Sequence, residues 1–353
     1  MTQTEPKTPR ADQFQGDREA FQVASGDTMK AMVNTKYGSP DVLQLKEIEK
    51  PTPQDNEVLV KVHAASVNAA DWHLLRGKPF LMRLMGFGLL KPKNKILGSA
   101  MAGRVEAVGR NVKQLQPGDE LFGDLTRCGW GAFAEYVCAS EDALALKPAN
   151  VTFEEAAAVP LAAVTALQGL RAKGQIKPGQ KVLIYGAGGG VGTFAVQIAK
   201  SFGAEVTAVC STRNVDMVRS IGADHVIDYT QADFTKNGQR YDLIFAVNGY
   251  HSIFDYKRAL NAKGVYVFIG GSIAAMFQAM FLGPVISMTG RQKMGSMGVA
   301  QPSQQDLVFM KELLEAGKVV PVIDRRYPLG ETAEALRYLE EGHAKGKVVI
   351  TVA

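Results

Sequence analysis

The chain has 353 residues, a length that suits two domains of ordinary size. Hydrophobic residues make up 46% and charged residues 21%, which is the balance of a globular protein rather than a disordered one. The net charge of +5 is dispersed without a dense Lys/Arg run, which argues against a nucleic-acid partner. The three cysteines include no CxxC pair, so we expect neither a disulfide framework nor a thiolate zinc cluster, and we predict a cytoplasmic protein.

The first 28 residues are polar and mixed in charge, and they lack the apolar core of a signal peptide. Acidic residues such as Glu5 and Asp12 also argue against an organelle transit peptide. We predict that residues 1–28 form a disordered tail and that the folded body begins near Met29.

Residues 30–147 have the pattern of β-strands. Glu57–Ala64 and Ala102–Gly109 alternate polar and apolar side chains, as half-buried strands do. Pro117–Asp119 marks a turn between such segments. We therefore predict an antiparallel, barrel-like domain in this half.

Two segments are locally very apolar, namely 80–90 and 273–288. Both are shorter than the roughly 20 uninterrupted apolar residues that cross a bilayer, so we expect no membrane span. A buried helix or an interface is the ordinary interpretation of each. The alternative is the wall of a site for a lipophilic molecule, which leaves room for peripheral association with a membrane.

The pattern changes near Val151. Residues 154–170 are Ala-rich and predict a helix, and after them strands and helices alternate. This alternation predicts a parallel sheet with helices on both faces. We expect strands at 181–185, 205–210, 226–227, 243–247 and 265–269, and helices at 191–202, 214–221, 306–316 and 332–341. The last strand, 346–352, is expected to return to the first domain.

The strongest local motif is a glycine-rich turn between a predicted strand and a predicted helix. It comprises Gly186, Gly189, Gly190, Val191 and Gly192. Glycines allow the backbone to turn tightly and to approach a pyrophosphate, which then meets the N-terminus of the helix. The motif predicts a dinucleotide site.

The end of the second strand of this unit selects the nucleotide. NAD enzymes place a carboxylate there, whereas this chain has Ser211, Thr212 and Arg213. Two hydroxyls and a guanidinium suit a 2′-phosphate, so we predict NADPH rather than NADH. The alternative is an ordinary polar surface loop.

From Met29 to Ala353 the chain resembles the medium-chain dehydrogenase/reductase superfamily, within it the zinc-independent quinone oxidoreductase branch. The resemblance implies a Rossmann-type doubly wound parallel sheet plus a GroES-like antiparallel β-barrel catalytic domain. We assign 29–151 and 300–353 to the GroES-like domain and 152–299 to the Rossmann domain. The motifs that carry it are 65–72, 103–109 with 117–119, the glycine turn, 222–224 with 228–229, and 346–349.

Zinc alcohol dehydrogenases carry Cys-His where this chain has Asn68-Ala69, and Gly-His-Glu where it has Gly98-Ser99-Ala100. Asn and Ser are poor zinc ligands and Ala is none, so we expect no catalytic metal. Zinc-free relatives often carry Asp at the position of Ala100, which is a departure of this chain from that branch.

The resemblance also implies site residues. Tyr229 is expected near the 2′-phosphate or adenine, and Asn248 near the ribose or nicotinamide. The backbone of Phe268 to Gly271, which includes Gly270, is expected beside the nicotinamide. Lys347 is expected to reach the cofactor phosphates. A structural tyrosine and a solvated lysine are the alternatives for Tyr229 and Lys347.

Asn68, Asp71 and His73 are the candidate catalytic residues, because the superfamily builds its reaction centre around them. Asp71 could instead be a buried cap, and His73 a structural histidine. We expect hydride transfer from NADPH to a small lipophilic quinone or, alternatively, to the double bond of an enone. Two further hypotheses are a non-catalytic NADPH-binding sensor and a zinc alcohol dehydrogenase. We expect a homodimer or a monomer.

Overall fold

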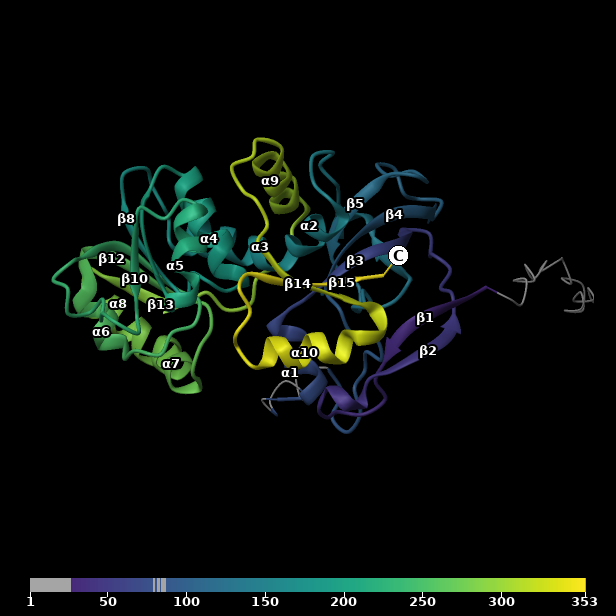
Figure 1. Cartoon of the computed structure of the whole chain (residues 1–353), viewed down its shortest axis with the longest axis horizontal. Helices are drawn as coiled ribbons and strands as arrows, with labels where there is room; N and C mark the ends of the chain where they lie inside the picture. The colour runs from purple at the N-terminus through teal and green to yellow at the C-terminus, as the bar shows by residue number, and fades with distance from the viewer. Residues whose placement is uncertain (1–26, 79, 81–82, 84–86, 353) are drawn as a thin grey trace, which may run out of the picture.

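The computed structural model describes residues 27–78, 80, 83 and 87–352. Residues 1–26 of the predicted tail therefore lie outside the described residues, as does part of the apolar segment 80–90. Thr28 belongs to the first strand, one residue before the predicted start of the folded body at Met29. Figure 1 shows two lobes, each built around a sheet, with the C-terminal strands between them.

The first lobe contains a mainly antiparallel sheet in the order β14-β15-β3-β4-β5-β7, with β6 also paired to β3. A separate antiparallel pair, β1 with β2, lies beside it. The predicted barrel-like architecture is confirmed, and β3 extends three residues beyond the predicted strand. The bounds are β1 Thr28–Val33, β2 Gln44–Glu49, β3 Glu57–Val67, β4 Ala100–Val108, β5 Glu120–Asp124, β6 Tyr136–Ser140 and β7 Leu144–Leu146.

The second lobe contains a six-stranded parallel sheet in the order β10-β9-β8-β11-β12-β13. Counted along the chain this is the 3-2-1-4-5-6 order of a dinucleotide-binding fold. Apolar residues cover both faces of the sheet in two core clusters, which explains why its strands are nearly continuous apolar runs. The bounds are β8 Lys181–Tyr185, β9 Glu205–Cys210, β10 His225–Asp228, β11 Tyr241–Ala246, β12 Leu260–Phe268 and β13 Lys293–Ser296.

The Ala-rich helix expected over 154–170 is divided. Helix α2 (Phe153–Ala158) ends before Pro160, which begins α3 (Pro160–Gln168), and a π-helical turn follows over Gly169–Lys173. Proline lacks an N–H and favours the first turn of a helix, so it divides one apolar pattern into two helices. Helices α4 Gly190–Ser201, α5 Val215–Ser220 and α6 Ile253–Ala259 belong to the second lobe, whereas α9 Gln304–Glu315 contacts both β7 and α3.

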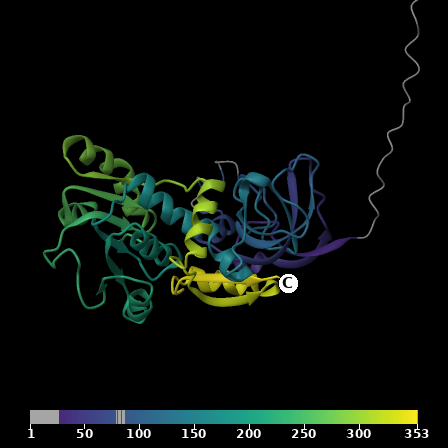
Figure 2. The same ribbon diagram turned by 90° about the horizontal axis from the view of Figure 1, so that it is seen from above.

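The C-terminal segment returns to the first lobe, as expected. Strand β15 (Lys347–Thr351) pairs antiparallel with β3, and β14 (Ile323–Pro328) pairs parallel with β15. Helix α10 (Thr332–Glu340) connects them and packs beside α1 (Ala69–Arg76). In Figure 2 the yellow C-terminal segment lies against the purple and blue half of the molecule. The domain boundaries near 151 and 300 stay a prediction.

The apolar segment 273–288 forms helix α7 (Ile273–Phe277), a π-helical turn (Gln278–Leu282) and helix α8 (Gly283–Thr289). The helical prediction is confirmed, but complete burial is not, because one side of the segment is exposed. Among the described residues, none of the helices has both the length and the hydropathy needed to cross a bilayer.

Candidate active site

The glycine turn joins β8 to α4 and has the geometry that the motif predicts. Gly186 has a φ of +83°, which favours glycine, and a Cβ on Gly192 would lie 2.1 Å from the carbonyl oxygen of Gly186. Gly189 precedes α4 and has open space on its Cβ side, where only the Gly186 oxygen comes within 4 Å. An open glycine at a helix N-terminus, whose first N–H groups have no intrahelical partner, fits the pyrophosphate of a dinucleotide.

Ser211, Thr212 and Arg213 follow β9, and the fold brings Tyr229 next to them. The N–H of Tyr229 donates to the Cys210 carbonyl (3.0 Å), and its side chain is 55% exposed. The Thr212 hydroxyl lies 3.0 Å from that of Thr230. The exposed Tyr229 therefore follows β10 next to the end of β9, at the end of the sheet where the adenosine half of a dinucleotide would bind.

A carboxylate that was not predicted to have a functional role lies at the same place. Asp228 ends β10, and its Oδ1 accepts hydrogen bonds from the backbone N–H (2.9 Å) and the hydroxyl (2.8 Å) of Thr230. Hydrogen bonds to the carboxylate lower the pKa of Asp228, and the one from Thr212 has a larger effect than those from Thr230. The sequence pattern placed Asp228 two strands from the glycine turn, and only the parallel pairing of β9 with β10 brings it beside Thr212.

Asn248 follows β11 and is exposed. It lies beside the glycine turn, since a Cβ on Gly186 would lie 3.3 Å from the Asn248 Cβ. Phe268 is 3% exposed, with its side chain in the core of the second lobe, so only its backbone can face a ligand, as expected. The N–H of Gly249 donates to the carbonyl of Gly270 (2.8 Å), which holds the ends of β11 and β12 together.

Lys347 is buried at the junction of the two lobes. Its Nζ donates to the carbonyl of Val67 (3.1 Å) and to Asn68 Oδ1 (2.5 Å), and the whole residue is 3% exposed. A solvated lysine is therefore excluded. Burial lowers the pKa of Lys347 to about 8. Its role at the cofactor phosphates stays a prediction.

The stem of Lys347 passes the glycine turn before the ammonium reaches Asn68. A Cβ on Gly190 would lie 2.9 Å from Lys347 Cδ, and the N–H of Gly346 donates to the Gly188 carbonyl (2.9 Å). The last strand thus places a cation between the dinucleotide turn and the start of α1.

Asn68 and Asp71 form a buried cap at the start of α1. The Asp71 carboxylate accepts from the backbone N–H of Asn68 (2.7 Å) and from that of Gly98 (3.1 Å). Burial raises the pKa of Asp71 to about 7, against these hydrogen bonds and the nearby Lys347 charge. Since both oxygens of Asp71 are held by the backbone, its geometry supports the alternative of a structural cap.

Two buried hydroxyls close to this cap were missed as functional candidates. Ser66 and Ser99 are fully buried, and their Oγ atoms have no hydrogen-bond partner within the described residues. Ser66 pairs with Ala100 across β3 and β4, and Ser99 follows Gly98, which binds Asp71. Ser66 lies beyond the predicted strand 57–64, and nothing in the sequence indicated that its hydroxyl would be buried without a partner. Unpaired buried hydroxyls can serve a bound ligand or water.

His73 lies at the other end of α1. Its ring stacks on Trp72 at 3.6 Å, and its Nδ1 lies 3.1 Å from the Lys78 carbonyl. Burial lowers the pKa of His73, so the neutral ring is favoured. Asn68, Asp71 and Lys347 meet at the N-terminal end of the helix, whereas the contacts of His73 are at its C-terminal end.

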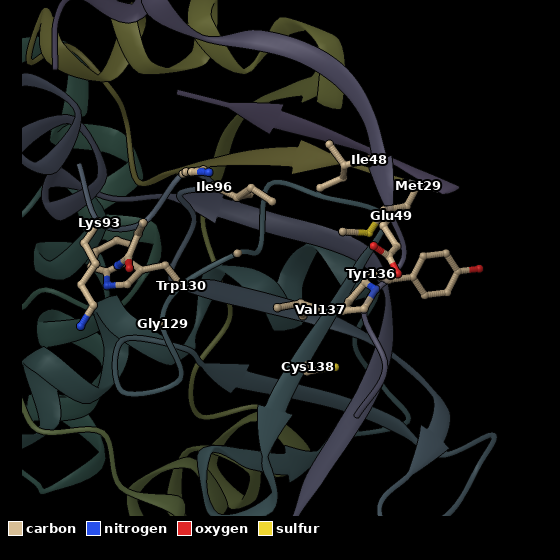
Figure 3. Close-up of a pocket in the computed structure, with 14 residues that line it drawn as sticks. Met29, Ile48, Glu49, Lys93, Ile96, Gly129, Trp130, Tyr136, Val137 and Cys138 are labelled. Carbon is tan, nitrogen blue, oxygen red and sulfur yellow. The ribbon is translucent and has the colours of Figure 1, made fainter. Parts of the chain in front are cut away.

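The first lobe also has an open cavity of about 450 Å³, whose lining includes Met29, Ile48, Trp130, Tyr136 and Cys138 (Figure 3). Neither the glycine turn nor Asn68 contributes to its lining, so it is distinct from the dinucleotide turn. Burial raises the pKa of Cys138 to about 12, which leaves the thiol protonated and agrees with a structural role. In the part of the chain that the structure describes, no three His, Cys, Asp or Glu side chains are grouped as a metal site.

Comparisons with known proteins agree with this architecture. Residues 54–149 match the family model for the alcohol dehydrogenase GroES-like domain, and residues 221–350 match that for zinc-binding dehydrogenases. The chloroplast envelope quinone oxidoreductase homolog of Arabidopsis thaliana is 34% identical, over 92% of this chain and 99% of its own. The 2-methylene-furan-3-one reductase of Solanum lycopersicum is 36% identical, over 91% of this chain and 79% of its own.

Among solved structures, the quinone oxidoreductase from Coxiella burnetii has a TM-score of 0.82 and 30% identity, and the match covers 93% of this chain and all of that one. The two-lobed fold, the glycine turn and these relatives lead to one conclusion. The chain belongs to the medium-chain dehydrogenase/reductase family, in its quinone oxidoreductase-like branch, and is an oxidoreductase that uses a nicotinamide cofactor.

Proposed function

We propose that this protein is an NADPH-dependent reductase that transfers hydride to a quinone or another electron-poor carbonyl acceptor without zinc. The observation that carries the proposal is the position of the Lys347 ammonium. It lies between the dinucleotide turn and the Asn68 amide, at the place where the zinc enzymes carry their metal ligands.

The glycine turn, Ser211 to Arg213 and Tyr229 would hold the cofactor, which supplies a hydride when it is bound. Two hydroxyls and the Arg213 guanidinium offer donors to a 2′-phosphate. In the structure Arg213 donates to the His343 carbonyl (2.8 Å), a neutral partner that a phosphate could replace. The Asp228 carboxylate already accepts two hydrogen bonds from Thr230 and so has less need of a ribose 2′-hydroxyl as donor, which is compatible with NADPH.

Lys347 and Asn68 would act on the acceptor. Reduction of a quinone or enone places negative charge on an oxygen, and a buried cation stabilises that charge strongly because the surroundings screen it little. Lys347 has only neutral oxygens as hydrogen-bond partners in the described residues. Asp71 holds the backbone of Asn68 and Gly98, so it would position this pair rather than react itself.

The names of relatives support both acceptor classes. Three of them have names that contain quinone oxidoreductase, and another is the NADPH-dependent alkenal/one oxidoreductase of Arabidopsis thaliana, at 34% identity. Reduction of a conjugated double bond is therefore the second candidate, and it would use the same cation for the enolate oxygen.

A fluorescence titration with NADPH and NADH, followed by quinone and then enone in the same cuvette, tests the proposal. We expect much tighter binding of NADPH and its oxidation when a quinone is added. Oxidation of NADPH by the enone but not by the quinone would favour the second candidate, reduction of a conjugated double bond. Tight binding with no turnover on either acceptor would contradict a reductase and favour a sensor, and a preference for NADH would contradict the role of Ser211 to Arg213.

A further inference from the structure

Helices α7 and α8, with the π-helical turn between them, expose an apolar face that no other part of the described chain covers. The exposed side chains of this ridge recur at the spacing of one helical face, and Phe277 stacks on Phe281 at 5.8 Å. Met288 is 86% exposed. The ridge comprises Ile273, Phe277, Met280, Phe281, Leu282, Val285 and Met288.

The opposite side of the same segment is also apolar. Ala275, Ala279 and Ile286 are buried in the core of the second lobe. No charged residue occurs between Ile273 and Thr289. A helix that is apolar all round is normally covered on every side. Contiguous exposed apolar surface of this kind marks an interaction site.

Strand pairing between two copies would be one way to cover this region, but α8 already occupies the edge of the sheet. The Ser287 hydroxyl accepts from the N–H of Met294 (2.8 Å) and lies 3.1 Å from its carbonyl oxygen. A Cβ on Gly283 would lie 2.6 Å from that same oxygen. Since the edge groups of β13 are satisfied at Met294, an added strand would have to displace α8.

The stretch of sequence that contains the ridge is rich in basic residues. Residues 256–305 contain five Lys and Arg and no Asp or Glu. Arg258 is paired with Asp255, and it is the only one of the five in an ion pair within the described residues. Lys257 and Arg291 lie near the C-terminal end of the ridge, where Gln292 donates to the Lys257 carbonyl (3.0 Å). An apolar face bordered by cations is complementary to an anionic lipid surface.

We propose that this ridge docks the protein on the surface of a membrane that contains anionic lipids, with the apolar side chains inserted at the level of the headgroups. Figure 1 shows α6, α7 and α8 together at the end of the second lobe that is remote from the first. The segment starts directly after Gly271 and Ser272, which follow the strand end assigned to the nicotinamide. Docking there would hold the second lobe at the membrane, which is the phase that dissolves a lipophilic acceptor. The docking itself does not depend on the proposed reaction.

Vesicle flotation of the full chain tests the inference. The probes are vesicles of phosphatidylcholine alone and of phosphatidylcholine mixed with phosphatidylglycerol. We expect the protein to bind the mixed vesicles, and we expect added salt to weaken this binding. Binding to pure phosphatidylcholine should be at least about tenfold weaker. The variant Phe277→Ser/Phe281→Ser/Met288→Ser should lose binding by a similar factor. Lys257→Gln/Arg291→Gln should weaken binding to the mixed vesicles only.

Matched controls replace exposed apolar and basic residues elsewhere, with Leu45→Ser/Val308→Ser/Val320→Ser and Lys46→Gln/Lys113→Gln. Thermal unfolding and NADPH affinity report whether each variant is folded. Flotation that is unchanged in folded ridge variants, or absent for wild type, overturns the inference. A dimer in light scattering that the ridge variant dissociates, without vesicle binding, also overturns it and assigns the ridge to a second copy.

Discussion

The Lys347 ammonium donates to the side-chain oxygen of Asn68 across 279 positions of the sequence. The bond joins the first residue of the last strand to the residue before α1, and it closes the side of the site that faces the glycine turn. Both residues are buried, so the pair is fixed before any ligand binds. Such preorganisation is what electrostatic stabilisation of a developing oxyanion requires.

Replacing Lys347 by Met keeps most of the length of the side chain and removes its charge. We expect kcat to fall roughly 100-fold, the size of effect seen when one oxyanion donor is removed. The loss should be larger for weakly electrophilic enones than for high-potential quinones, because the latter need less stabilisation. NADPH affinity should change much less. If Lys347→Met weakened NADPH binding strongly and left kcat intact, the lysine would be a phosphate ligand instead.

Activity should also depend on the charge of Lys347. Burial holds its pKa at about 8, below the usual value, so the ammonium loses its proton as pH rises through that range. We expect kcat to decline above about pH 8 in wild type. Lys347→Arg should abolish this decline, since guanidinium stays protonated. A decline that persists unchanged in folded, active Lys347→Arg would assign the titration to another group.

The stability of the fold should change in the same pH range. The folded-state pKa of Lys347 is depressed, so between about 8 and its unfolded value the unfolded chain binds more protons than the folded one. Stability therefore gains a contribution from this group as pH rises above about 8. Denaturant unfolding of wild type and Lys347→Met at several pH values measures it, and the two pH slopes should differ there.

Substitutions at two nearby glycines of the turn should affect different properties, Gly192 the stability of the fold and Gly189 the binding of NADPH. A methyl group on Gly192 would meet the Gly186 oxygen at 2.1 Å, so Gly192→Ala should lower the free energy of unfolding by at least the roughly 1–3 kcal/mol of an overpacked site. Gly189 has open space, so Gly189→Ala should unfold like wild type but bind NADPH weakly. Titration calorimetry and thermal unfolding on both variants check this. Normal NADPH binding by Gly189→Ala would contradict the placement of the pyrophosphate.

Nucleotide preference should reside in Ser211 and Arg213. Arg213→Ala removes a charge-assisted donor, so we expect NADPH affinity to fall by roughly 10- to 100-fold while NADH affinity stays constant. Ser211→Asp should reverse the preference, because a carboxylate repels a 2′-phosphate and accepts from a 2′-hydroxyl. Arg219→Ala, an exposed arginine on α5, is the matched control. Equal losses for both nucleotides in Arg213→Ala would argue for a structural role.

Much of the fold could be predicted from local pattern. The strands and helices around the glycine turn have the expected order, and Gly186 and Gly192 have the backbone conformation and close packing that the motif demands. Short or interrupted elements were harder to predict. The helix over 154–170 is divided at Pro160, and β13, with only four residues, had no distinct pattern.

The candidate site could be predicted only in part. Asn68, Asp71 and Lys347 were identified, but nothing in the local sequence indicated that the ammonium would contact Asn68, or that His73 would contact the other end of α1. The hydroxyls of Ser66 and Ser99 and the carboxylate of Asp228 became relevant only through strand pairing.

The sequence by itself determined the type of most elements and the family, because side-chain periodicity and the glycine turn depend on neighbouring residues. The tertiary structure alone decided which groups are buried and what they contact. Lys347 became a buried cation because β15 adds to β3, more than 270 residues away in sequence, and passes the glycine turn. The same holds for the ridge, since whether an apolar helix is covered depends on which elements of the folded chain reach it.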